Sequence, residues 1–133
     1  MSEYEGTIDS AVPVLRVASV ARSMAWYVDV LGFSPDPVGP PDNPFFAILR
    51  RDGVEIMYQT RASVIEDHPG SAGELDGHSI VLFITVDSLD EVEKALAGAP
   101  VVKHRHDTFY GSTEIYVREP GENTVGFAQM GTA

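Results

Sequence analysis

Residues 11–33, AVPVLRVASVARSMAWYVDVLGF, form the stretch that decides the fold. Apolar residues recur at alternate positions over residues 12–17, and a period of two predicts a β-strand with one buried face. Ser19 follows as an N-cap for a helix, and Gly32 can adopt the left-handed conformation that ends many helices. The stretch therefore predicts a strand that leads directly into a helix.

The remainder of the first half predicts further strands. Residues 45–49 and 54–58 are rich in apolar side chains and flank Asp52-Gly53, a strong signal for a two-residue hairpin. Residues 62–77 are polar and acidic and contain Pro69 and several glycines, a composition typical of a linker or covering loop.

The second half repeats this order. Residues 79–86 predict a strand, and Ser88 with Glu91 forms a capping-box pattern for a helix that stops at Gly98. Three more strands are predicted at residues 101–104, 113–118 and 124–129. The sequence therefore predicts one α+β domain, 1–133, built from two βαβββ modules: module one about 11–61, a linker 62–77 and module two about 78–130.

Composition limits the classes of function. The chain has 133 residues, 44% of them hydrophobic, which suffices for one domain with a sizeable core. It has no cysteine, which excludes disulfides and thiolate nucleophiles. No secretion signal and no run of 18 apolar residues is present, so we expect a cytoplasmic protein with no membrane partner. The net charge of −11 disfavours nucleic acid as a partner and favours cationic ligands.

Two motifs, AVPVL at residues 11–15 and WYVDVLGF at residues 26–33, resemble the vicinal oxygen chelate superfamily. That superfamily contains glyoxalase I, the extradiol dioxygenases and the bleomycin-resistance proteins, and the motifs are most similar to the bleomycin-resistance branch. The closing turn, residues 119–123, is Glu-Pro-Gly-Glu-Asn where the family has Asp-Pro-x-Gly-Asn. The resemblance implies that the two modules form a curved mixed sheet around a cleft, usually within a homodimer.

The resemblance also implies four positions for metal ligands, and in this chain they fall on Val12, Met57, Val81 and Gly126. A catalytic metal needs about three oxygen, nitrogen or thiolate ligands, and this set offers one weak thioether. We therefore predict no metal and no cofactor. His104 and His106 are two residues apart on a predicted strand, but two ligands without a third more often mark a solvated strand end.

The period of two predicts which side chains face the cleft. A two-residue hairpin at Asp52-Gly53 pairs residue 48 with 57 and 46 with 59. Arg16 lies where glyoxalase-like relatives contact a substrate carboxylate, Tyr116 matches a tyrosine of the extradiol dioxygenases, and Tyr110 lies on a loop that could close over the site. The predicted ligand-binding residues are Arg16, Phe46, Met57, Gln59, Phe83, Tyr110, Glu114 and Tyr116.

Simpler interpretations exist for several of these residues. Phe46, Met57 and Phe83 could belong to the core, and Arg16 could form a structural ion pair with Glu114 across the sheet.

The leading hypothesis is a metal-free, homodimeric binding protein that sequesters a small amphipathic or cationic organic compound. The first alternative is an enzyme. It would be either a metal-dependent lyase or dioxygenase with displaced ligands around His78, His104 and His106, or a metal-free isomerase using Glu114. The second alternative is a scaffold with a vestigial cleft. Whether the two modules form one cleft within a chain or between two chains stays open.

Overall fold

The computed structural model describes residues 3–67 and 80–131. The first module contains β1 (Val14–Val17), α1 (Val20–Leu31), β2 (Ser34–Val38), β3 (Phe46–Arg51) and β4 (Val54–Thr60), and α2 (Arg61–Asp67) follows it. The second module contains β5 (Val81–Thr85), α4 (Leu89–Ala95), β6 (Val101–Asp107), β7 (Ser112–Arg118) and β8 (Thr124–Met130). The predicted α+β class and the two βαβββ modules are confirmed.

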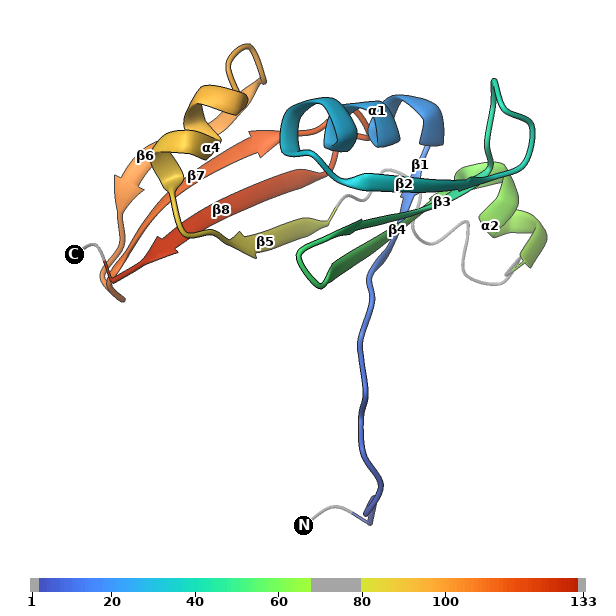
Figure 1. Cartoon of the computed structure of the whole chain (residues 1–133), viewed down its shortest axis with the longest axis horizontal. Coiled ribbons are helices and arrows are strands. Elements are labelled where there is room, and N and C mark those ends of the chain that lie inside the picture. Colours follow the sequence, from blue (N-terminus) through green and yellow to red (C-terminus); the bar gives the residue numbers. More distant parts are fainter. Residues whose placement is uncertain (1–2, 68–79, 132–133) are drawn as a thin grey trace.

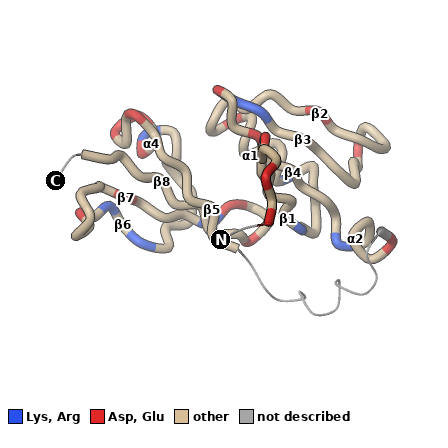
Figure 2. Tube along the Cα trace, turned by 90° about the horizontal axis from the view of Figure 1, so that it is seen from below, with Lys and Arg blue, Asp and Glu red and all other residues tan. Residues whose placement is uncertain are grey.

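Each module forms its own four-stranded mixed sheet, and the two sheets have the same topology. The strand orders are β1-β4-β3-β2 and β5-β8-β7-β6, with the first strand of each module parallel to the last. The sheets lie side by side, and α1 and α4 cover the same side of the molecule (Figures 1 and 2). The side of each sheet turned away from these helices is called its open face below.

The predicted helix signals act as expected. Ser19 Oγ accepts a hydrogen bond from the Arg22 backbone N–H at 3.2 Å, and Gly32 ends α1 with a φ of 73°. Ser88 Oγ accepts from the Glu91 backbone N–H at 3.2 Å at the start of α4. Both caps satisfy backbone groups that a helix end leaves without a partner.

Two elements differ from the sequence-based expectation. β2, SPDPV, was not predicted, because its two prolines and lack of apolar alternation are atypical of strands. It is an edge strand that pairs with β3 alone, a position in which a missing N–H is tolerated. The first part of the predicted linker is helical, as α2, and linker residues 68–77, including His68 and Pro69, lie outside the described residues.

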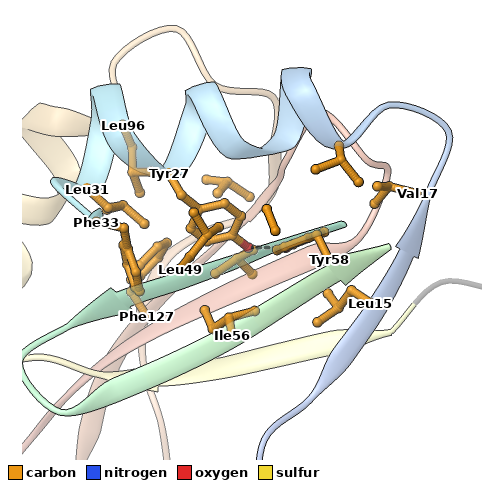
Figure 3. Close-up of a cluster of buried hydrophobic side chains, with 14 of the residues drawn as sticks. Leu15, Val17, Tyr27, Leu31, Phe33, Leu49, Ile56, Tyr58, Leu96 and Phe127 are labelled. Carbon is orange, nitrogen blue, oxygen red and sulfur yellow. Dashed lines mark hydrogen bonds between the residues drawn. The ribbon is translucent and has the colours of Figure 1, made fainter. Parts of the chain in front are cut away.

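A single hydrophobic core lies between the helices and the two sheets (Figure 3). It contains Leu31 and Phe33 of the first module together with Phe127 of the second, so the two modules share one core. Tyr58 donates a 2.6 Å hydrogen bond to the Tyr27 hydroxyl at its centre, and burial raises the pKa of both phenols, so both stay neutral. Shared burial makes the modules one stability unit and leaves their open faces for other contacts.

The closing turn is organised by a buried carboxylate. Glu119 is 2% exposed, and its oxygens accept from the backbone N–H groups of Gly121 and Asn123 and from the Asn123 side-chain amide, at 2.8, 2.9 and 3.0 Å. The Asn123 Oδ1 in turn accepts from Ile80 N–H at 3.0 Å, just before β5. Glu122, where the family has glycine, has a φ of 68°. The departure from the family motif therefore leaves a closed, fully bonded turn.

The described helices include none that is both long and apolar enough to cross a membrane.

Candidate functional site

The open face of the second sheet carries an ordered group of polar and aromatic side chains. Cross-strand register places Thr85, Ala128, Glu114 and His106 in one row, and Phe83, Gly126 and Tyr116 in the next. Glu114 and Tyr116 alternate with the buried Ile115 and Val117, which belong to the core on the helix side. The strand pattern therefore fixes a carboxylate and a phenol side by side on the open face.

Glu114 is the centre of this group. It is 1% exposed, and its Oε2 accepts from the Tyr110 hydroxyl at 2.5 Å and from Ser112 Oγ at 2.7 Å. Its Oε1 accepts from the Tyr116 hydroxyl at 2.8 Å. Among the described residues Glu114 forms no ion pair with Lys, Arg or His, and hydroxyl groups donate the hydrogen bonds that hold the carboxylate.

These hydrogen bonds set the protonation state of the group. Burial would raise the pKa of Glu114, but the hydrogen bonds from Tyr110, Ser112 and Tyr116, helped by the nearby His106, outweigh it and the pKa is lowered. Burial and the bond to Glu114 raise the pKa of Tyr116 to about 12, and the bond to Glu114 raises the pKa of Tyr110. At neutral pH the site is thus an ionised carboxylate surrounded by neutral hydroxyl donors.

Three residues of this group were not among the predicted site residues. Ser112 donates to Glu114, Thr108 Oγ1 lies 2.7 Å from Ser112 Oγ, and the His106 ring stacks on Tyr116 with centroids 6.2 Å apart. Ser112 could have been found, because it precedes Glu114 and Tyr116 at the same period of two. His106 was considered only as a metal ligand.

His104 and His106 do not follow simple alternation. β6 has register shifts between Val101 and Lys103 and between Lys103 and His106, so the expectation that the two rings share one face does not hold on this irregular strand. His106 pairs with Glu114, and its Nδ1 lies 2.8 Å from the His104 carbonyl oxygen. Within the described part of the chain no group of three or more His, Asp or Glu side chains could hold a metal.

Gly126 explains how Tyr116 reaches its position. Gly126 is the cross-strand partner of Tyr116, and a Cβ added to it would lie 2.3 Å from Cε2 of the Tyr116 ring. The ring therefore lies directly over the backbone of β8, in space that any larger residue at 126 would need. Gly126 is also the last of the four positions at which metal-dependent relatives place a ligand, as implied by the sequence resemblance.

The other three ligand positions implied by the resemblance also lack side chains that suit a metal ion. In both modules the first position lies two residues before the register partner of the second, since Val14 pairs with Met57 and Phe83 pairs with Gly126. Val12 and Val81 therefore occupy equivalent places. Two valines, a methionine and a glycine covered by a phenol ring do not fit a catalytic divalent ion, which needs hard or borderline donors.

The open face of the first sheet gathers the remaining predicted residues. Arg16, Gln59 and Phe46 are successive cross-strand partners, and Met57 pairs with Ile48 in the next row, as the hairpin signal predicted. Gln59 is largely buried and donates from Nε2 to Ser63 Oγ of α2 at 2.9 Å. Arg16 lies in this sheet and Glu114 in the other.

The eight predicted residues therefore divide between two open faces. Tyr110, Glu114 and Tyr116 are brought into direct contact, while Phe83 lies in the same cross-strand row as Tyr116 and is 48% exposed. Phe46, Met57 and Phe83 are outside the buried core cluster. None of the eight lines either of two cavities, of about 380 and 480 Å³, that lie between the modules and are bordered by residues of α1 and α4.

Comparison with known proteins agrees with the fold and with the repeated module. Residues 7–127 match the family model for the glyoxalase/bleomycin resistance protein/dioxygenase superfamily. The chain belongs to this superfamily. The match extends over both modules of the superfamily fold, and the finer assignment to the bleomycin-resistance branch stays a prediction.

Solved structures of the superfamily resemble this chain in fold over nearly its whole length. A glyoxalase/bleomycin resistance protein/dioxygenase from Nocardioides has a TM-score of 0.73 at 16% identity, covering 94% of this chain and 85% of that one. TioX from Micromonospora sp. ML1 has a TM-score of 0.72 at 23% identity, covering 90% and 96%. A lactoylglutathione lyase from Agrobacterium tumefaciens has a TM-score of 0.69 at 18% identity, covering 92% and 95%.

No curated protein sequence matches this chain significantly. Since the solved structures share less than a quarter of its residues, they support the superfamily fold and leave the activity to be argued from the site.

Proposed function

We propose that this superfamily member is a metal-free binding protein that holds a small amphipathic organic cation against Glu114. The observation that carries the proposal is a 1%-exposed, ionised carboxylate that hydroxyl groups hold and that, with His106 nearby, forms no ion pair among the described residues. A buried charge is costly unless a counter-charge accompanies it. A ligand cation would supply that counter-charge.

The aromatic residues around Glu114 suit the same ligand. The Tyr116 ring lies over Gly126 and next to His106, and Phe83 exposes its ring one strand beyond Gly126. Aromatic faces attract cations and also bury the apolar part of an amphipathic molecule. The net charge of −11 adds long-range attraction for a cation.

Tyr110 offers a route to the buried carboxylate. It lies on the turn between β6 and β7, and the residue is 49% exposed although its hydroxyl reaches Glu114. Rotation of this one side chain would free one of the two acceptor positions in use on Oε2, and a ligand ammonium would replace the lost hydroxyl as donor. Ser112 and Tyr116 would keep the carboxylate in place.

The electrostatics of Glu114 favour binding over proton transfer. A catalytic base works best when its pKa is raised toward the working pH, whereas the pKa of Glu114 is lowered. The metal-free isomerase alternative therefore has weaker support than binding. We include in the proposal the homodimer expected from the resemblance. In such a dimer, the open face of a sheet in one copy would lie against the open face of a sheet in the second copy.

The affinity of phenethylamine, measured by calorimetry, tests the proposal. We expect saturable binding to the protein and binding at least tenfold weaker to Glu114→Gln, because this variant loses the charge and keeps a hydrogen-bonding side chain of the same size. 2-Phenylethanol, which has no charge, is expected to bind at least tenfold more weakly than phenethylamine to the unaltered protein.

Glu55→Gln is the matched control for this experiment. It removes one carboxylate from β4, which lies in the first sheet, and Glu55 is an ion-pair partner of Arg50 at 3.4 Å. We expect its phenethylamine affinity to stay within twofold of the unaltered protein. Equal weakening by the two variants would mean that the ligand senses only net charge, and the proposed role of Glu114 would then be wrong.

Metal content separates the binding protein from a metal-dependent enzyme of the same superfamily. After incubation with zinc, nickel, manganese and iron and gel filtration, we expect less than about a tenth of a metal ion per chain, since no described set of three donors exists. Elemental mass spectrometry measures this directly. A content near one ion per chain would contradict the assignment of Val12, Met57, Val81 and Gly126 as the ligand positions.

A further inference from the structure

The cavity of about 480 Å³ shares no lining residue with the group around Glu114 and has a different chemistry. It is bounded by α1 on one side and, on the other, by the end of α4 with its following loop and by the end of β7 with the closing turn. Its lining residues are Arg22, Trp26, Val30, Ala95, Leu96, Ala97, Gly98, Ala99, Pro100, Arg118, Glu119 and Pro120. The volume falls in the range of small-molecule sites, and most of the wall is apolar.

The polar part of this wall is unusual for such an acidic chain. Lys and Arg number only nine against twenty acidic residues, yet two arginines and the only tryptophan border this one cavity. Arg22 and Trp26 are four residues apart on α1 and so lie on one side of the helix. Guanidinium groups bind carboxylate and phosphate through paired hydrogen bonds, and an indole offers a flat apolar surface.

Neither arginine is used by the fold in an ion pair. Among the described residues, ion pairs form at Arg50, Arg51 and Arg105 and none is found at Arg22 or Arg118, and Arg118 donates a 3.3 Å hydrogen bond to the Glu122 carbonyl oxygen. Both side chains are exposed. A surface with excess carboxylates would be expected to pair its arginines, so two unpaired ones beside an apolar cavity leave cationic groups available to a ligand.

Glu119 also borders the cavity, but its carboxylate is engaged elsewhere. Both of its oxygens accept hydrogen bonds from Gly121 and Asn123 within the closing turn. Three donors stabilise its negative charge at that place. The net charge of the lining is therefore +1, from two arginines and one glutamate, in a chain whose net charge is −11.

We infer that this cavity is a second binding site, for a small aromatic anion whose carboxylate or phosphate lies between Arg22 and Arg118 and whose ring packs against Trp26. The site is independent of the cation site at Glu114 and uses no residue of it. A ligand there would contact α1 of the first module and the α4 end and closing turn of the second, and would therefore stabilise their association.

Trp26 makes the test direct, because it is the only tryptophan of the chain and it lines this cavity. Titration of the full chain with benzoate is expected to change the emission excited at 295 nm saturably, with a Kd on the order of 1 mM for so small a ligand. Benzamide and benzylamine, which lack the negative charge, are expected to bind at least fivefold more weakly. Phenyl phosphate is the second anionic probe, and a lower Kd than that of benzoate would identify the ligand class as phosphate esters.

Three variants decide whether the arginines are responsible. Arg22→Gln and Arg118→Gln are each expected to weaken benzoate binding about fivefold, and the double variant to abolish the saturable change. Arg50→Gln, an exposed arginine that pairs with Asp36 and Glu55 in the first sheet, is the matched control and should bind as the unaltered protein does. Thermal melting of each variant shows that it is folded. The absence of a saturable change in the unaltered protein, or an unchanged Kd in the double variant, would overturn the inference.

Discussion

Replacing Glu119 with alanine is expected to lower the free energy of unfolding by about 3 kcal/mol. The carboxylate is 2% exposed and accepts hydrogen bonds from two backbone N–H groups and one side-chain amide. Alanine would leave all three donors without their partner in a buried turn, at about 1 kcal/mol or more each. The turn also positions Asn123, whose Oδ1 holds Ile80 N–H at the start of β5, so the loss would extend to an edge strand.

Urea unfolding of the unaltered protein and the variant measures this loss, and thermal melting should show a decrease of about 10 °C in the midpoint. Glu119→Gln is expected to lose less, because its amide oxygen still accepts while its NH₂ group faces the Gly121 N–H. The exposed Glu122 lies in the same turn, so Glu122→Gln is the matched control and should change stability by less than about 0.5 kcal/mol. A Glu119→Ala variant as stable as this control would show that the carboxylate is not what closes the turn.

The sequence was a good guide wherever a local rule determines the structure. The Asp52-Gly53 signal gave the correct pairing of Phe46 with Gln59 and of Ile48 with Met57. Ser19 and Gly32 cap the two ends of α1 as expected, because capping depends on residues within one turn of the helix. The period of two also placed Glu114 and Tyr116 on one face of β7, which is a property of any regular strand.

The features that were not predicted depend on contacts between distant parts of the chain. β2 exists because β3 offers it an edge, and its own residues, SPDPV, carry no strand pattern. The register shifts of β6 interrupt the alternation on which the prediction that His104 and His106 share one face was based. Likewise the contact of Tyr110 with Glu114 requires the conformation of the turn between β6 and β7, which no rule of spacing provides.

The four positions at which metal-dependent relatives place ligands could be assessed partly from the sequence and partly only from the structure. The resemblance alone located four positions, and the absence of donors there could be seen in the sequence. The structure adds that Tyr116 covers Gly126 and that its hydroxyl reaches Glu114, so the region carries an alternative set of interactions. The Tyr116 ring therefore requires a glycine at position 126, a relation that a single sequence does not reveal.

Gly126→Ala is expected to destabilise the protein by about 2 kcal/mol and to disturb the proposed cation site at the same time. The new methyl group would lie 2.3 Å from Cε2 and 2.7 Å from Cδ2 of Tyr116, far inside van der Waals contact. The ring must therefore move, and its hydroxyl would leave Glu114 Oε1. Urea unfolding measures the first effect, and calorimetric titration with phenethylamine measures the second.

A double-mutant cycle with Tyr116→Ala identifies the cause. If the ring is the obstacle, Gly126→Ala should cost little once the ring is removed, and the two free-energy changes should differ from additivity by more than about 1 kcal/mol. Tyr116→Phe keeps the ring and removes the hydroxyl. By itself it should show only the effect of losing the hydrogen bond to Glu114, and Gly126→Ala should still lower the free energy of unfolding in this background. Additive changes in the cycle would contradict the packing of Tyr116 on Gly126, and with it the proposal that Tyr116, over the position where metal-dependent relatives place a ligand, forms part of an organic-cation site.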